Sequence, residues 1–183
     1  MTSAASVSGD ERLRLFLALR LSDGVLDEVE RWQTEHLRDV RIVPRRHLHI
    51  TLVFLGHRPS GELESIVGAL RDAAAAAGEI RLTPVRYRET RSAGMLVLED
   101  EGGHAALLAR DVQDRLEHLG VYHRESRPWL PHLTVARWRK PPRLQLEPPP
   151  VRTFVPSDVA AYLSRLHPRG AQYEVLESVA LGG

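Results

Sequence analysis

The sequence contains no cysteine, which removes several kinds of chemistry. A chain without thiols has no disulfide, no thiolate zinc site and no cysteine nucleophile. Lysine is nearly absent too, since Lys140 is the only one in 183 residues, and arginine therefore carries almost all the positive charge. We attribute this bias to codon usage rather than to ligand binding by every arginine. Any active site must use nitrogen and oxygen side chains.

Long apolar runs and a strong net charge are also missing. No segment approaches the roughly 20 apolar residues that cross a bilayer, and residues 1–10 have neither the basic start nor the apolar segment of a secretory signal. We expect a cytoplasmic protein with no membrane contact, in which residues 1–10 form a flexible tail. The formal charge of +1 argues against broad neutralisation of nucleic-acid phosphates, so any contact with RNA should be local.

The most informative feature that is present is a tetrapeptide pattern, His-x-Thr-x, which occurs twice with a spacing of 83 residues. His49 opens the first copy and His132 the second. Residues i and i+2 of a strand share a face, so His49 and Thr51 point the same way, as do His132 and Thr134. The apolar residues between them face the core. Two such strands side by side would frame a cleft with two imidazoles and two hydroxyls.

These side chains suit proton transfer at a phosphoryl group. An imidazole with a pKa of about 6.5 can act as acid or base near neutrality. Attack and departure at phosphorus are roughly in line, so two facing imidazoles can serve both sides, while threonine hydroxyls can donate hydrogen bonds to the non-bridging oxygens. A single copy of the pattern is typical of any half-buried strand. Two copies with matching flanks favour a catalytic cleft.

The flanks of the two copies also carry a resemblance to a known family. Residues 47–56 and 131–137 resemble the paired signatures of the two-histidine phosphoesterases, and are most similar to those of the bacterial and archaeal RNA 2',3'-cyclic phosphodiesterases, once called 2'-5' RNA ligases. Residues 164–166 and 170–176 resemble the closing hairpin of that family. The resemblance implies two pseudo-symmetric lobes of antiparallel sheet, flanked by helices, with the cleft between them.

The resemblance also implies roles for individual residues. His49 would be the proton donor to the leaving oxygen and His132 the proton acceptor for water, although internal symmetry leaves this assignment reversible. Thr51 and Thr134 would bind the phosphate. Arg137 is a further candidate, but strand alternation puts it on the face opposite His132, so a twist or a bulge is needed to bring it into the cleft. The implied reaction hydrolyses a terminal 2',3'-cyclic phosphate to a 2'-phosphate, and its reverse is 2'-5' RNA ligation.

Several alternatives remain open at this point. The same site could act on a 2'-5' oligoadenylate or a small cyclic nucleotide, or the chain could be a noncatalytic module that binds RNA ends. His47 and His49 share a face and could form half of a metal site, but nothing nearby in the sequence supplies a third ligand. We therefore expect a substrate that is an RNA end or a small nucleotide, and no metal or cofactor. Phe54 is expected in the core.

The chain length suits one domain over residues 11–183, which the resemblance implies is two-lobed and which we expect to be monomeric. Strands are expected at 13–19, 48–55, 80–88, 94–98, 133–138, 159–166 and 173–179, and helices after Ser22, over 61–77 and over 104–119. We expect the strand with the first motif to stop at Gly56, and the third helix to carry one apolar stripe from Leu107 to Leu119. The five prolines in 140–150 predict a surface loop. Two cycles of strand, helix and motif strand indicate an internally duplicated α+β protein.

Overall fold

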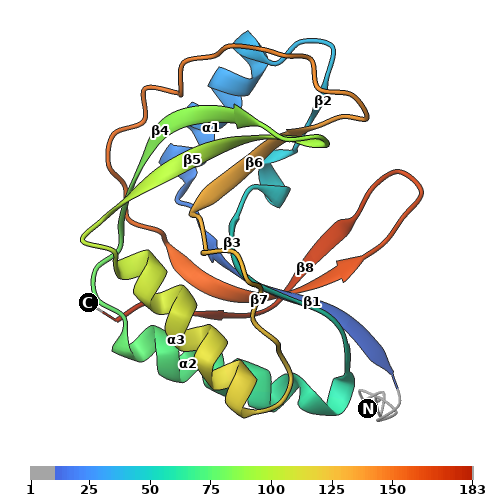
Figure 1. The fold of residues 1–183 in the computed structure, drawn as a ribbon, viewed down its shortest axis with the longest axis vertical. Helices are drawn as coiled ribbons and strands as arrows, with labels where there is room; N and C mark the ends of the chain where they lie inside the picture. Colours follow the sequence, from blue (N-terminus) through green and yellow to red (C-terminus); the bar gives the residue numbers. More distant parts are fainter. Residues whose placement is uncertain (1–10, 183) are drawn as a thin grey trace, which may run out of the picture.

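Two antiparallel four-stranded sheets form the two lobes of the fold (Figure 1). The computed structural model describes residues 11–182, so the expected tail at 1–10 lies outside it. The first sheet contains, in order, β3 (Ile50–Pro59), β1 (Arg12–Arg20), β7 (Asp158–Arg165) and β8 (Gln172–Val179). The second contains β2 (Arg41–Ile42), β6 (His132–Arg137), β5 (Ala93–Glu101) and β4 (Arg81–Glu89).

Three α-helices in the described residues 11–182 cover the sheets, and two of them cross from one lobe to the other. The helices are α1 (Asp23–His36), α2 (Leu63–Ala76) and α3 (His104–His118), with short 3-10 turns η1 (Arg45–His47) and η2 (Ser60–Glu62). Helix α1 follows β1 but packs on the second sheet, where the ring of Trp32 lies 5.8 Å from that of Tyr87 in β4. Helix α3 follows β5 but packs with α2 beneath the first sheet (Figure 1). Each motif strand is therefore backed by a helix from the other half of the chain.

The alternation of leucines in β1 explains why this strand is central to its sheet. Leu15, Leu17 and Leu19 are all buried, and β1 pairs with β3 on one side and β7 on the other. Complete burial of each leucine side chain stabilises the fold by about 1.5 to 3 kcal/mol. The same apolar cluster includes residues of β5 and β6, so one core runs beneath both sheets.

The expected helices and strands are present, with differences that have physical causes. Strand β3 does not stop at Gly56 but continues to Pro59. Gly56 pairs with Leu15 beside a bulge and adopts a φ of +68°, which glycine tolerates. The apolar stripe of α3 is narrower than expected, because Leu107 and Leu119 are 59% and 44% exposed. The short β2 was not predicted.

The two motif strands lie in different lobes, as the resemblance implied. Strands β3 and β6 belong to different sheets, so the two motifs meet across the space between the lobes. Residues 140–150 form neither helix nor strand, as their prolines predicted. Within residues 11–182, no helix has the length and apolar character needed to cross a membrane.

Candidate active site

The two motif histidines make the same hydrogen bond. Nδ1 of His49 lies 2.8 Å from the carbonyl oxygen of His47, and Nδ1 of His132 lies 2.8 Å from that of Leu130. A carbonyl only accepts, so Nδ1 is the protonated nitrogen of each neutral ring and donates to the backbone two residues upstream. This leaves both Nε2 atoms for other partners, and Nε2 of His49 lies 3.1 Å from Oγ1 of Thr51.

The five candidate site residues identified from the sequence all line one cavity of about 690 Å³. We call it the catalytic cleft, and it is lined by His49, Thr51, His132, Thr134 and Arg137, together with side chains from both lobes. Cavities of this size are typical of sites for small molecules or single nucleotides. The cleft therefore places two imidazoles, two hydroxyls and a guanidinium around one volume.

Arg137 reaches the cleft because β6 contains a bulge. In the pairing with β5, Met95 lies opposite Thr134 and Gly94 opposite Ala136, so Val135 is an extra residue. The extra residue resets the alternation: Val135 and Ala136 are both buried, and Arg137 returns to the face that carries Thr134. Within residues 11–182 the guanidinium of Arg137 makes no ion pair or hydrogen bond, which leaves it available to an anion.

The surroundings of His49 favour its neutral form. Its ring lies 4.8 Å from the ring of Phe16 and 5.5 Å from that of Tyr173. Burial among these groups lowers the pKa of His49 to about 4, although the hydrogen bond to His47 raises it, and the charges of His132 and Arg137 contribute to the lowering. His49 is therefore neutral at pH 7 in the free cleft. A bound phosphate, being anionic, would raise its pKa.

His47 lines the catalytic cleft together with His49. It lies in η1 rather than in a strand, and its ring packs 4.6 Å from the ring of Tyr173. Burial also lowers the pKa of His47. No group of three or more histidine, aspartate or glutamate side chains in residues 11–182 is placed to hold a metal ion.

Phe54 was expected in the core and is instead 47% exposed at the rim of the cleft. The guanidinium carbon of Arg14 lies 4.5 Å from its ring centre, in a cation–π contact. Arg14 and Phe16 also line the cleft, and sequence reasoning missed both. The available signal was the alternation of β1, because both residues lie on the face opposite its leucines.

Two tryptophans donate hydrogen bonds to backbone carbonyls near the cleft. Nε1 of Trp129 donates to the carbonyl of Thr51 at 3.0 Å, and Nε1 of Trp138 donates to that of Thr90 at 3.2 Å. Trp129 thus ties the segment ahead of the second motif to the first motif. Trp138 packs over Gly94, where an added Cβ would lie 2.7 Å from its ring.

Two lobes that each present a His-x-Thr-x strand to a common cleft define the class of two-histidine phosphoesterases. The model of one family, described as the 2'-5' RNA ligase superfamily, matches residues 21–168. The chain belongs to this superfamily.

Individual relatives agree with this assignment. A protein of Thermus thermophilus named RNA 2',3'-cyclic phosphodiesterase is 30% identical over 93% of this chain and 91% of its own length. A protein of Methanocaldococcus jannaschii with the same name is 22% identical over 90% of this chain and 99% of its own length. The crystal structure of E. coli LigT complexed with 3'-AMP has a TM-score of 0.79 at 20% identity, and covers 94% of this chain and 100% of that chain. This last likeness concerns the fold.

Proposed function

We propose that this protein hydrolyses the 2',3'-cyclic phosphate at an RNA end to a 2'-phosphate. The observation that carries the proposal is the matched pair of imidazoles, each fixed through Nδ1 by a backbone carbonyl and each lining one cleft with a threonine two residues on. The names of the two relatives from Thermus thermophilus and Methanocaldococcus jannaschii support the choice of substrate.

The proposed reaction needs only two proton transfers. His132 accepts a proton from water through Nε2 while the water oxygen forms a bond to phosphorus. The bond from phosphorus to the ribose O3' breaks, and His49 donates a proton to that oxygen through Nε2. His49 must first gain its proton, and the negative charge of the bound phosphate favours this step because it raises the lowered pKa of the ring.

The remaining three side chains are proposed to stabilise the charge on phosphorus. Thr51 and Thr134 donate their hydroxyl hydrogens to the non-bridging oxygens, and the guanidinium of Arg137 supplies a positive charge. In the free cleft the Thr51 hydroxyl donates to Nε2 of His49, so substrate binding exchanges this bond for one to phosphate. Loss of one such donor typically lowers kcat by about 10²- to 10³-fold.

The same groups can also carry out the reaction with an alcohol in place of water as the nucleophile. If the 5'-hydroxyl of an RNA takes the place of water, His132 removes its proton, the oxygen attacks phosphorus, and O3' leaves with a proton from His49. The product is a 2'-5' phosphodiester. Water is far more concentrated than any RNA end, so hydrolysis should dominate.

The test is hydrolysis of a short RNA that ends in a 2',3'-cyclic phosphate, in the presence of EDTA, with identification of the product isomer. The native chain should yield a 2'-phosphate, and His49→Ala and His132→Ala should each lose most of the activity, by about 10²-fold or more. His47→Ala should retain most activity, since it is the backbone carbonyl of His47 that holds His49.

Each other outcome selects a different function. Activity that disappears in EDTA and in His47→Ala would indicate a metal-dependent hydrolase that uses His47 and His49 as ligands. Activity only on 2'-5' oligonucleotides or small cyclic nucleotides would keep the mechanism and change the substrate. Binding of the RNA end without turnover by the folded native chain would indicate the noncatalytic module.

The proposal also covers the domain organisation, the oligomeric state and the cellular compartment of the protein. We propose that residues 11–183 act as one two-lobed domain, as a monomer, in the cytoplasm and without a metal or cofactor. A chain that begins at residue 11 should keep full activity, and light scattering should give the mass of one copy, 20.6 kDa for the full chain. A dimer mass, or loss of activity without the first ten residues, would contradict this part.

A further inference from the structure

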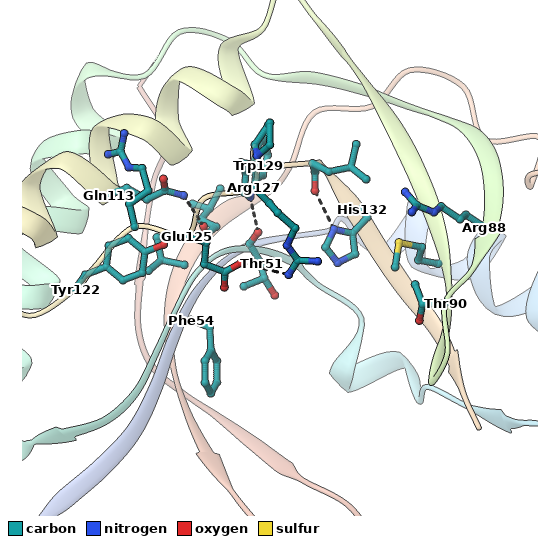
Figure 2. A pocket seen from close by; sticks show the side chains of 16 residues that line it. Thr51, Phe54, Arg88, Thr90, Gln113, Tyr122, Glu125, Arg127, Trp129 and His132 are labelled. Carbon is teal, nitrogen blue, oxygen red and sulfur yellow. Dashed lines mark hydrogen bonds and ion pairs between the residues drawn. The ribbon is translucent and has the colours of Figure 1, made fainter. Parts of the chain in front are cut away.

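The backbone carbonyls that hold the two motif histidines belong to segments of different kinds. Nδ1 of His132 donates to the carbonyl of Leu130, as the dashed line at His132 shows (Figure 2). The next residue, Pro131, has a fixed φ, and its own carbonyl accepts a hydrogen bond from the amide of Leu98 in β5 at 3.0 Å. A proline and a neighbouring strand therefore fix the carbonyl at the second motif.

Within the described residues, the carbonyl at the first motif has neither support. It belongs to His47, the last residue of the η1 turn, and β3 begins only at Ile50. The amide of His47 donates to the carbonyl of Pro44 at 2.8 Å, and the amide of Leu48 donates to that of Arg45 at 3.1 Å. Hydrogen bonds in a 3-10 turn have poorer geometry than those of an α-helix. The direction of the His47 carbonyl therefore depends on what else holds the turn.

Arg45, the first residue of η1, holds the turn through its side chain. Its Nη1 donates to Oδ1 of Asp27 at 2.6 Å and to Oε2 of Glu30 at 2.8 Å, and its Nη2 donates to Oδ1 of Asp23 at 2.9 Å. The three carboxylates lie at positions i, i+4 and i+7 of α1, and therefore on one face of that helix. A guanidinium donates to several oxygens in fixed directions, which a flexible ammonium does not. Arg45 thus connects η1 to α1 at three points.

This connection joins the two lobes and does not involve the substrate directly. Helix α1 packs on the second sheet, whereas η1 leads into β3 of the first sheet. Arg45 does not line the catalytic cleft. Its guanidinium is also surrounded by three carboxylates, which disfavours the binding of an anion there. Any effect of Arg45 on the reaction must therefore pass through the turn.

We propose that Arg45 is a positioning residue that fixes the ring of His49 through the carbonyl of His47. This inference rests on the proposed function, in which His49 gives a proton to the leaving oxygen. The carbonyl accepts the Nδ1 proton of His49 at 2.8 Å, so that Nε2 is the atom that transfers the proton. The same hydrogen bond raises the pKa of His49, because the charged ring keeps its donor to the carbonyl. It therefore favours the form that a proton donor needs.

Arg45→Met keeps an unbranched side chain and removes the guanidinium. Displacement of a reacting group by about 1 Å can cost about 10²-fold, and we expect a smaller displacement because η1 keeps its backbone hydrogen bonds. For a short RNA that ends in a 2',3'-cyclic phosphate, kcat should therefore fall roughly tenfold. The KM should change less than about twofold, because Arg45 lies outside the cleft. Arg45→Lys, which keeps the charge without the planar fork, should recover part of the loss.

Arg46→Met is the matched control in the same turn. Arg46 is exposed, and within residues 11–182 it makes no ion pair or hydrogen bond. Its replacement removes one positive charge next to Arg45 and should leave kcat within about twofold of the native value.

The tautomers of the two histidines separate positioning from a loss of stability. Nitrogen NMR spectra, assigned with His49→Gln and His132→Gln, should show the proton of each neutral ring on Nδ1 in the native chain. In Arg45→Met, His49 should populate the form with the proton on Nε2, while His132 should keep its proton on Nδ1. His132 thus serves as the internal control in the same sample. A residue that only stabilises the fold would leave both tautomers unchanged.

The outcomes for Arg45 and for the proposed function are distinct. Arg45→Met that folds with a lower melting temperature, but with the native tautomer of His49, would overturn the inference whether or not kcat falls. Equal effects of Arg45→Met and Arg46→Met would also overturn it. If the native chain does not hydrolyse the cyclic phosphate, the proposed function fails, and a change of tautomer at His49 alone would still support the positioning by Arg45.

A variant on the helix side keeps the test available if Arg45→Met does not fold. Asp27→Ala combined with Glu30→Ala removes both carboxylates that Nη1 of Arg45 contacts. This double variant should change the tautomer of His49 in the same direction and lower kcat by a smaller factor, since Asp23 still pairs with Arg45. A native tautomer in the folded double variant would contradict the proposed connection.

Discussion

Gln33 is the residue whose substitution tests most directly how the active site is held together. It lies in α1 and is 1% exposed. Its Nε2 donates to the carbonyl of Val43 at 3.0 Å and to that of Val135 at 2.9 Å. Val135 is the bulge residue that brings Arg137 into the cleft, and Val43 lies at the start of the segment that leads from β2 to His49. One amide thus connects the supports of both motifs.

Gln33→Met keeps the length of the side chain and removes both hydrogen bonds. The carbonyl of Val43 loses its only described partner, at a cost of about 1 to 3 kcal/mol. The carbonyl of Val135 still accepts a hydrogen bond from the amide of Val43 at 3.0 Å. Removing the bond from Gln33 to this carbonyl therefore costs only about 1 kcal/mol. We therefore expect the free energy of unfolding to fall by about 2 to 4 kcal/mol.

Gln113 offers a matched control from the other half of the chain. It lies in α3, and its Nε2 donates to the carbonyl of Leu52, in the first motif, but at 3.4 Å. A single long bond is worth about 1 kcal/mol or less. Urea unfolding of Gln113→Met should therefore show a clearly smaller loss than that of Gln33→Met.

Kinetics separate a role in positioning from a role in stability alone. If Gln33 acts on the reaction through the bulge, Gln33→Met should lower kcat/KM in the native background and have much less effect once Arg137 has been replaced by alanine. The reasoning is refuted if Gln33→Met and Gln113→Met lose the same stability. It is also refuted if the kinetic loss is the same with and without Arg137.

Two further predictions follow from the environment of the cleft. Between pH 6.5 and about 4 the unfolded chain binds a proton at His49 that the folded chain does not, because the folded pKa is lowered. Stability should be complete above pH 6.5 and fall as the pH drops through this window, by up to about 3 kcal/mol. Urea titrations of His49→Gln should show a flatter dependence, and identical slopes in both proteins would contradict the assignment. Gly94→Ala should lower the melting temperature, because its Cβ would lie 2.7 Å from the ring of Trp138 and from the hydroxyl of Tyr87, an overpacking that costs about 1 to 3 kcal/mol. An unchanged melting temperature and tryptophan spectrum would show that Trp138 moves freely.

Local patterns predicted much of this fold because each one is repeated over several residues. The leucines of β1 alternate without interruption, and the two His-x-Thr-x copies combine alternation with a functional set of side chains. Both motifs lie at the cleft, and the five residues selected from the sequence are among those that line it. The expected hairpin of β7 and β8 is confirmed, and the chain turns between them where Gly170 donates to the carbonyl of His167.

What the sequence did not predict depends on a single residue or on distant contacts. The bulge at Val135 has no glycine and no other local signal, although the need for one could be argued from the position of Arg137. Gly56 was taken as a strand end, and only the pairing partner shows that the chain bends there and continues. Phe54 lies on the cleft side of β3 because Leu52 is an extra residue opposite β1, where Leu17 pairs with Val53 and Ala18 with Thr51, and this bulge resets the alternation.

The crossing of α1 and α3 between lobes explains why the buried glutamines matter. Each helix leaves the sheet of the strand before it and packs behind the motif strand of the other half, where Gln33 reaches Val135 and Gln113 reaches Leu52. Relative motion of the lobes would then have to break contacts in the core behind both motifs. Acid–base catalysis at phosphorus requires two groups at a fixed separation on opposite sides of one atom. The 2.9 Å bond from Gln33 to Val135 is the stronger of the two links. The position of the second motif should therefore depend on α1 more than the position of the first motif depends on α3. We expect the loss of kcat to be larger for Gln33→Met than for Gln113→Met.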